Sequence, residues 1–263
     1  MSTEKPHPGS TLPDLSDHAV LVTGASGAVG HGIARQFARA GASVIAHYRT
    51  GEGRAESLAE AIRAEGGRAL ALAAHLSDEA GCRSLIERSA EWAGRLTALV
   101  NNAGIQPVQP LETMTVTEWR HVVDTNLTTA FACTQAAAEI MGRAGGGTVT
   151  HVASVEGSRP ARLHAHYSAS KAALIMHARA AALEYGPLGI RVNTVSPGLV
   201  HRPGLAEDWP DGVRRWERAA PLSRKGDAED VGNACVFLAS PLAGWVTGHD
   251  LVVDGGMSCA PAW

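Results

Sequence analysis

The sequence predicts an α/β protein that forms one doubly wound parallel sheet of about seven strands, with helices on both faces. Short apolar runs alternate with longer segments of helical periodicity along almost the whole chain. A glycine-rich turn joins the first apolar run to the first helical segment, and the 263 residues include 29 glycines. Because parallel strands need crossover connections, usually helices, this alternation favours a parallel sheet.

The first half of the chain predicts four strands, each followed by a helix. The strands are short apolar runs bounded by turn residues, and the helices repeat apolar residues at helical spacing. In order, we expect strand 19–23, helix 30–40, strand 43–47, helix 54–64, strand 69–73, helix 80–92, strand 96–100 and helix 116–141.

The second half continues the alternation after a run of three glycines, Gly145, Gly146 and Gly147, which ends the long helix. In order, we expect strand 148–153, helix 165–185, strand 190–195, helix 229–238 and strand 250–253. The sequence has no internal repeat or linker, so we expect one domain over residues 17–263. Residues 1–16 are rich in proline and lack an apolar core, so we expect a flexible tail there and no signal peptide.

Composition and charge argue against several classes of protein. The chain is 45% hydrophobic and 19% charged, which is typical of a globular domain. Its net charge of −3 and the lack of a basic block argue against a nucleic-acid partner. No apolar run reaches the ~18 residues of a membrane span. The four cysteines show no metal-ligand spacing, so we expect free thiols, no metal site and a cytoplasmic location.

A glycine-rich segment, Thr23-Gly24-Ala25-Ser26-Gly27-Ala28-Val29-Gly30, lies between the first predicted strand and the first predicted helix. Glycines there let the backbone turn sharply and approach a pyrophosphate closely. The N-terminus of the following helix offers unpaired N–H groups and a favourable dipole to phosphates. The segment therefore predicts a dinucleotide site, although an ordinary turn is the alternative when the segment is considered alone.

Tyr167 and Lys171 stand at Tyr-x-x-x-Lys spacing at the start of a predicted helix. This spacing places both side chains on one face of a helix, about one turn apart. A neighbouring ammonium lowers the pKa of a phenol, and a phenol tuned toward neutrality is a usable general acid or base. Alone, the pair also fits an ordinary helix surface.

Taken together, these features resemble the short-chain dehydrogenase/reductase family over about residues 17–256. Thr23, Gly24 and Gly30 match the family's Thr-Gly-x-x-x-Gly-x-Gly loop, whose middle glycine is replaced by Ala28 and preceded by Gly27. The resemblance implies a Rossmann-like fold and an oxidoreductase that transfers hydride between a nicotinamide and a carbonyl compound or secondary alcohol.

Further family motifs follow in the expected order. Asn101-Asn102-Ala103-Gly104 matches a stretch on the adenosine side, Pro197-Gly198 a turn at the nicotinamide end, and Asp254-Gly255-Gly256 a C-terminal signature. The resemblance implies that the cofactor is bound by Thr23, Gly24, Ser26, Gly27, Ala28, Val29, Gly30, Tyr48, Arg49, His75, Leu76, Asn102, Ala103, Gly104, Tyr167, Lys171, Pro197, Gly198 and Val200.

The resemblance also implies four catalytic residues, Asn126, Ser154, Tyr167 and Lys171. A ketone that accepts hydride develops negative charge on its oxygen. Ser154 can donate a hydrogen bond to that oxygen, and Tyr167 can deliver the proton. By family analogy, Lys171 favours the phenolate and holds the nicotinamide ribose. Asn126 lies in a helix, where it can free a backbone group to position water.

Three positions depart from the family pattern. His75 replaces an aspartate near the adenine, and Thr97 replaces an aspartate before the fourth strand's asparagines. Arg202 replaces a threonine that often holds the nicotinamide carboxamide. That carboxamide contact is therefore in doubt, and Arg202 can instead bind a phosphate or a substrate anion.

Cofactor choice is decided at the end of the second strand. A carboxylate there would bind the ribose hydroxyls and repel a 2′-phosphate, which selects NAD. The chain has Tyr48 at that position, followed by Arg49, and arginine binds phosphate bidentately. We therefore favour NADP(H), with NAD(H) as the alternative if Arg49 is only a solvated surface charge.

The substrate pocket is expected under a lid over residues 199–222, which carries Trp209, Trp216 and several arginines. Two tryptophans suggest a bulky or partly aromatic substrate, although packing of the lid on the domain is equally consistent. His164 and His166 flank the catalytic helix start and can line the pocket or serve a structural role. Glu156 and Arg159 are second-line candidates.

Three functions are consistent with the sequence. The first is an NADP(H)-dependent carbonyl reductase or alcohol dehydrogenase. The second is an NAD-linked dehydrogenase of a sugar, steroid or other secondary alcohol, and the third is a nucleotide-binding regulator without turnover. Tyr167 and Lys171 weigh against the third. The family resemblance further implies a homo-oligomer, most simply a tetramer, packed through helices 116–141 and 165–185.

Overall fold

In the computed structural model, which describes residues 12–259, seven parallel strands form one sheet in the order β3-β2-β1-β4-β5-β6-β7. The strands are β1 (Ala19–Val22), β2 (Ser43–Tyr48), β3 (Ala69–Ala73), β4 (Ala98–Asn101), β5 (Gly147–Val152), β6 (Ile190–Pro197) and β7 (Asp250–Val253). The predicted parallel sheet of a single Rossmann-like domain is confirmed.

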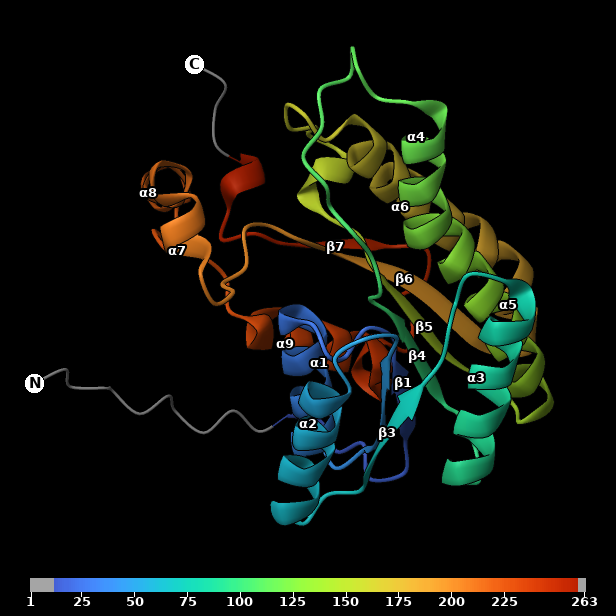
Figure 1. Ribbon diagram of the computed structural model, residues 1–263. Helices are drawn as coiled ribbons and strands as arrows, with labels where there is room; N and C mark the ends of the chain where they lie inside the picture. Colours follow the sequence, from blue (N-terminus) through green and yellow to red (C-terminus); the bar gives the residue numbers. More distant parts are fainter. Residues whose placement is uncertain (1–11, 260–263) are drawn as a thin grey trace, which may run out of the picture.

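Helices cover both faces of the sheet (Figure 1). The longer ones are α1 (Ala28–Arg39), α2 (Glu52–Ala64), α3 (Glu79–Ala93), α4 (Val116–Val123), α5 (Thr129–Arg143), α6 (Ala165–Tyr185), α8 (Pro210–Ala219) and α9 (Ala228–Ala239). One face carries α1, α2 and α9, and the other carries α3, α5 and α6. Each face buries its own apolar core, centred on residues such as Ile33 and Phe37 on the first and Leu85 and Met141 on the second.

Side-chain caps fix where several helices begin. Asp78 accepts a hydrogen bond of 2.8 Å from the backbone N–H of Gly81 at the start of α3. Thr115 and Glu118 form a reciprocal capping box at the start of α4, and Asp227 and Asp230 form another at α9. Each cap satisfies backbone donors that a helix N-terminus leaves free.

The long helix predicted over residues 116–141 is interrupted. A π-helical segment, Asp124–Thr128, separates α4 from α5 and contains Asn126. Such segments carry one extra residue in a turn and occur often at functional sites. The predicted lid region is also more structured than the sequence indicates, because it contains the short helix α7 (Leu205–Asp208) as well as α8.

Part of the predicted N-terminal tail packs on the domain. Most of the predicted tail, residues 1–11, lies outside the described residues. Leu15, at the end of that predicted tail, is fully buried, and its N–H donates to the Ala40 carbonyl over 2.7 Å. The packed part of the chain therefore extends to at least this residue.

The helices and side chains of residues 12–259 bear on two expectations, the absence of a membrane span and of a metal site. None of the helices in this part is long and apolar enough to cross a membrane. The same residues contain no cluster of three or more His, Cys, Asp or Glu side chains arranged to hold a metal ion. The cysteines Cys82, Cys133 and Cys235 are buried free thiols, and Cys259 is exposed. The cytoplasmic location stays a prediction.

Candidate functional site

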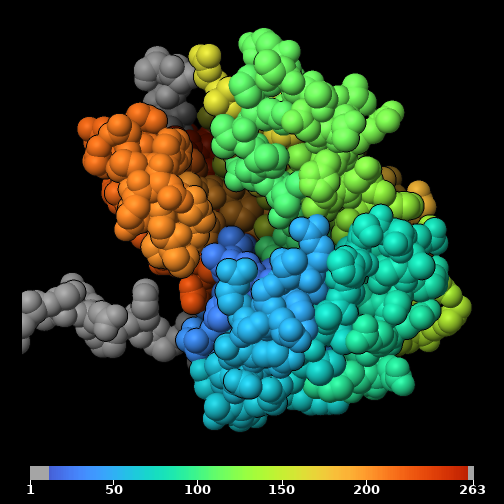
Figure 2. All heavy atoms as spheres, in the orientation of Figure 1, coloured from blue at the N-terminus to red at the C-terminus, as the bar shows by residue number. Residues whose placement is uncertain are grey.

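A large cavity of about 1970 Å³ opens at the carboxyl ends of the central strands. In Figure 2 it is the hollow between the lid helices α7 and α8, the loops of the N-terminal half and the region before α4. Loops that follow parallel strands all emerge at the same edge of the sheet, and ligands of open α/β sheets bind there. The cavity therefore joins the expected cofactor loop and the expected catalytic residues in one space.

The glycine-rich loop forms one end of the cavity. Gly24 has a φ of +68°, a left-handed conformation that favours glycine. A Cβ on Gly30 would lie 2.5 Å from the Gly24 carbonyl oxygen, so this position admits no side chain without movement. No side chain caps the N-terminus of α1, which begins at Ala28. The free backbone donors and the tight approach fit a pyrophosphate.

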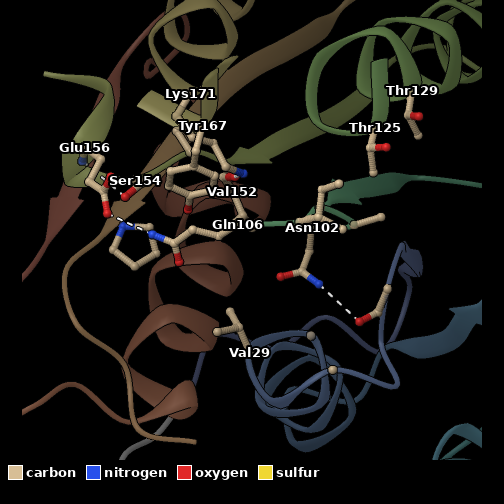
Figure 3. Close-up of a pocket in the computed structure, with 18 of the residues that line it drawn as sticks. Val29, Asn102, Gln106, Thr125, Thr129, Val152, Ser154, Glu156, Tyr167 and Lys171 are labelled. Atoms are coloured by element: carbon tan, nitrogen blue, oxygen red, sulfur yellow. Dashed lines mark hydrogen bonds between the residues drawn. The ribbon is translucent and has the colours of Figure 1, made fainter. Parts of the chain in front are cut away.

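Thr23 and Asn102 hold this loop against the strand β4. The Thr23 hydroxyl accepts hydrogen bonds of 3.0 Å from the N–H groups of Asn102 and Ala103. The Asn102 amide donates to the carbonyls of Thr23 (2.9 Å) and Gly24 (3.2 Å), as seen in part in Figure 3. Thr23 itself is buried and does not line the cavity, so it positions the loop without reaching a ligand.

His47 is a positioning residue that the sequence did not single out. Its Nδ1 accepts the Gly24 N–H over 3.1 Å, and its Nε2 lies 3.3 Å from the Ala74 carbonyl. Only the tautomer with hydrogen on Nε2 satisfies both contacts. Burial lowers the pKa of His47 to about 4, so the ring stays neutral and keeps this tautomer at neutral pH.

Tyr48 and Arg49, the two cofactor residues predicted at the end of β2, lie in different environments. Arg49 is exposed and lines the cavity, as do His75 and Leu76. Tyr48 does not line the cavity, because its ring packs in the core and its hydroxyl donates to Glu52 over 3.2 Å. Successive strand residues face opposite sides, so His47 and Tyr48 cannot both point toward the loop.

Tyr167, Ser154 and Lys171 meet at the other end of the cavity (Figure 3). Ser154 lies two residues after the end of β5, and Tyr167 lies in the first turn of α6. Burial raises the pKa of Tyr167 to about 12, while a hydrogen bond with Ser154 acts in the opposite direction. The predicted lowering of this pKa is wrong for the structure, because burial of the phenol outweighs the effects that favour the phenolate.

Lys171 is buried beneath Tyr167. Its Nζ donates to the Val152 carbonyl over 2.7 Å and lies 5.5 Å from the centroid of the Tyr167 ring. Burial lowers the pKa of Lys171 to about 8. The two side chains therefore lie on one face of α6, as their spacing predicts, and both line the same cavity.

Asn126 is buried in the π-helical segment and does not line the cavity. Its Oδ1 accepts the Ile105 N–H (2.8 Å), and its Nδ2 donates to the Ile105 carbonyl (3.0 Å) and to Ser170 Oγ (3.1 Å). A Cβ on Gly104 would lie 3.1 Å from Asn126 Oδ1 and 3.7 Å from Lys171 Nζ. Asn126 thus ties the loop after β4 to the helix that carries Tyr167.

The turn after β6 and the lid close the side of the cavity. Pro197, Gly198 and Val200 line it, and a Cβ on Gly198 would lie only 2.5 Å from the Trp216 ring. Trp216 therefore packs directly against the glycine backbone. Arg202 also lines the cavity, but its guanidinium is paired with Asp208 of the lid over 2.8 Å.

The second-line candidates separate into two groups. Glu156, Arg159 and His164 line the cavity, whereas His166 is fully buried and outside it. The Nδ1 of His166 accepts the Tyr167 N–H over 2.9 Å, which supports the structural reading of that histidine. All the predicted cofactor residues line the cavity except Thr23 and Tyr48.

Comparisons with known proteins agree with this arrangement. A family model described as enoyl-(acyl carrier protein) reductase matches residues 24–258. The chain is 38% identical over 253 residues to 3β-hydroxysteroid dehydrogenase 1 of Eggerthella lenta, covering 95% of this chain and 97% of that relative. It is 40% identical over 249 residues to L-rhamnose 1-dehydrogenase (NAD(P)(+)) of Azotobacter vinelandii, covering 92% and 97%.

A solved structure shows the same fold. The 7α-hydroxysteroid dehydrogenase complexed with NADH and 7-oxo glycochenodeoxycholic acid has a TM-score of 0.88 and 30% identity, covering 92% of this chain and 95% of that chain. Two of these similar proteins are hydroxysteroid dehydrogenases and the third is a sugar dehydrogenase. The similarities therefore indicate a class of reaction and leave the substrate open.

Proposed function

The chain belongs to the short-chain dehydrogenase/reductase family, and we propose that it uses NADP(H) to interconvert a carbonyl compound and its secondary alcohol. Family membership makes it a nicotinamide-dependent oxidoreductase of a small molecule. The observation that carries the proposal is the meeting of Ser154, Tyr167 and Lys171 in the same cavity as the glycine-rich loop.

The residues of the cavity fit a nicotinamide dinucleotide. The backbone donors of residues 24–30 suit its pyrophosphate, and Arg49 suits a 2′-phosphate. Pro197 and Gly198 line the end of the cavity expected for the nicotinamide, and Lys171, which lines the same cavity, would hold the ribose. When bound, the cofactor supplies or accepts hydride.

The protein's own groups handle the substrate oxygen and the proton. With a pKa of about 12, the Tyr167 phenol keeps its proton at neutral pH and can donate it to the oxygen of a carbonyl as charge develops there. Ser154 donates a hydrogen bond to the same oxygen. Asn126, fixed by Ile105 and Ser170, holds the loop and helix around the proton donor.

Two further features belong to this proposal. Residues 199–222 act as a lid, in which Trp209 and Trp216 line the cavity above the reacting groups. The protein assembles as a homotetramer, and the exposed apolar side chains of Phe131, Met176 and Leu183 on α5 and α6 support contact between subunits there.

The function is tested by following the absorbance of the reduced nicotinamide with a panel of ketones and secondary alcohols, using NADPH and NADH in parallel. We expect the wild type to reduce at least one ketone or to oxidise at least one secondary alcohol of the panel. No turnover with any member of the panel and either cofactor would favour the nucleotide-binding regulator.

The preference for NADP(H) is tested with Arg49→Asp. The substitution removes a phosphate partner and adds repulsion, so NADPH binding should weaken by about 1.5–3 kcal/mol more than NADH binding. Arg39→Asp, an equal charge change at an exposed residue outside the cavity, is the control. An unchanged ratio of the two dissociation constants in Arg49→Asp would show that the arginine does not contact the phosphate and would favour NAD(H).

A further inference from the structure

A carboxylate and an imidazole form a fixed pair in the wall of the cavity next to the reacting groups. His164 Nδ1 lies 3.0 Å from Glu156 Oε2, and the side chains of the two residues are only 17% and 16% exposed. Gln106 donates to Glu156 Oε1 over 2.8 Å, and Ser168 donates to Oε2 over 3.3 Å. Glu156 is therefore anchored by three side chains.

The pair adjoins the residues proposed to act on the substrate oxygen. The Glu156 N–H donates to Ser154 Oγ over 3.1 Å, and the His164 ring meets the Tyr167 ring edge to face with centroids 6.2 Å apart. Figure 3 shows Glu156, Ser154 and Tyr167 on one wall of the cavity, with Gln106 beside them. A substrate group that binds His164 would therefore be attached close to the carbon that reacts.

The backbone before His164 is held in an uncommon conformation. Leu163 has a φ of +68°, which side-chain-bearing residues adopt at a cost. Its carbonyl accepts the Gln109 N–H over 2.8 Å, which ties it to the loop after β4. Strained residues of this kind cluster where a side chain must be held in place for binding.

The hydrogen bonds determine what His164 offers to a ligand. A carboxylate only accepts, so His164 Nδ1 must carry the hydrogen that faces Glu156. Within residues 12–259, the opposite nitrogen, Nε2, has no hydrogen-bond partner, and the ring lines the cavity. In the neutral ring Nε2 accepts a hydrogen bond, and in the protonated ring it donates one.

We propose that the Glu156–His164 pair binds a hydroxyl group adjacent to the reacting carbon, so that the substrates are vicinal diols and their α-hydroxy carbonyl counterparts. The inference rests on the proposed function and narrows its substrate class. A hydroxyl suits both forms of the ring, because it donates to the neutral form and accepts from the protonated one. A methylene group does neither, and it would leave the His164 nitrogen without a partner.

An anionic group is the competing ligand. Arg159 and Arg162 line the same part of the cavity and carry the charge that a carboxylate needs. However, the Glu156 carboxylate sits directly behind His164 and offsets the charge of a protonated ring. A neutral hydroxyl therefore fits the pair better than a carboxylate does.

The test measures binding separately from chemistry. The protein–NADPH complex is titrated with cis- and trans-1,2-cyclohexanediol, cyclohexanol and cyclohexanecarboxylate, and binding is followed by the fluorescence of the reduced nicotinamide. None of these ligands has a ketone or aldehyde for the reduced cofactor to reduce, so the readout is affinity alone. One added hydrogen bond to His164 should make at least one diol bind about 10-fold more tightly than cyclohexanol.

Variants of His164 test whether the preference for diols depends on the Glu156–His164 pair. His164→Phe keeps a ring but removes Nε2, so the diol preference should fall to about 2-fold or less, and His164→Gln should restore part of it. His249→Phe, at an exposed histidine outside the cavity, should keep the wild-type preference. NADPH affinity should be the same in all four proteins, which shows that the variants are folded.

The outcomes separate this proposal from the function it rests on. Equal affinity for diols and cyclohexanol, no diol binding, or a preference that survives in His164→Phe would overturn the proposal. Tighter binding of cyclohexanecarboxylate that depends on His164 would also overturn it. A His164-dependent diol preference in a protein that turns over no ketone or secondary alcohol of the panel would contradict the proposed function and leave the hydroxyl-binding site standing. Turnover of other members of the panel without any oxidation of diols would overturn the diol substrate class and leave the proposed function standing.

Discussion

At the scale of single residues, burial changes the proton affinity of Tyr167 and Lys171 in opposite directions. It raises the pKa of the phenol to about 12 and lowers that of the ammonium to about 8. Burial disfavours the charged form of either group, and the phenol is neutral when protonated whereas the amine is neutral when deprotonated. The sequence placed both residues correctly, but their protonation depends on the depth of the cavity wall, which spacing along a helix does not reveal.

The pH dependence of stability tests the burial of Lys171. Between about pH 8 and 10.5 only the unfolded chain keeps the proton on this residue, so the free energy of unfolding should rise with pH across that range. Relative to Lys171→Met, the wild type should gain up to about 3 kcal/mol. Urea unfolding of both proteins at a series of pH values measures the difference, which cancels other titrating groups. Parallel curves for the two proteins would contradict a buried, proton-binding lysine.

At the scale of elements, the loop between β1 and α1 is the best predicted part of the site. Its glycines, its position after a strand and the following helix were all visible in the sequence. Its support was not visible, because His47 and Asn102 reach it from distant parts of the chain through contacts that only the folded sheet creates. The π-helical segment around Asn126 likewise has no pattern in the sequence.

Gly30→Ala tests the tightness of this loop. The new Cβ would lie 2.5 Å from the Gly24 carbonyl oxygen and 2.6 Å from the Asn102 amide. Overpacking of this kind costs about 1–3 kcal/mol, and cofactor binding should weaken with it because the loop must move. Thermal unfolding and NADPH titration measure the two effects.

Gly53→Ala is the matched control for that substitution. A Cβ on Gly53, in α2, would meet no atom within 4 Å. The change should raise stability by about 0.4–1 kcal/mol through the unfolded chain, without altering cofactor binding. Equal effects of the two substitutions would show that the loop has room for a side chain at Gly30.

At the scale of the whole molecule, the sequence predicted the architecture well because it depends on many residues at once. Strand and helix periodicity recurs in every unit, so single misplacements, such as the start of β4, do not alter the sheet order. The direction of a single side chain, in contrast, depends on one position and is not supported by a recurring pattern. Tyr48 was assigned to the cofactor, yet its place in β2 turns its side chain into the core.

The oligomeric state tests whether the exposed apolar face of α6 contacts another subunit. Met176 and Leu183 on α6 are 59% and 82% exposed, which favours burial of this face against another subunit. Light scattering at micromolar concentration should give a tetrameric mass for the wild type and a smaller mass for Met176→Glu/Leu183→Glu, because buried carboxylates are costly. Leu111→Glu, at a residue that is 64% exposed and belongs to neither α5 nor α6, should leave the mass unchanged. A monomeric wild type would remove the proposal.

The most direct test of the account is the rate of hydride transfer in a single turnover, measured for the wild type and Tyr167→Phe with a confirmed carbonyl substrate. The substitution keeps the ring and its packing but removes the proposed proton donor. The rate should fall by roughly 10²–10⁴, the usual contribution of general acid–base catalysis, while NADPH affinity and thermal stability stay near wild-type values. A variant that reduces the substrate at nearly the wild-type rate would contradict the assignment of Tyr167 as the proton donor.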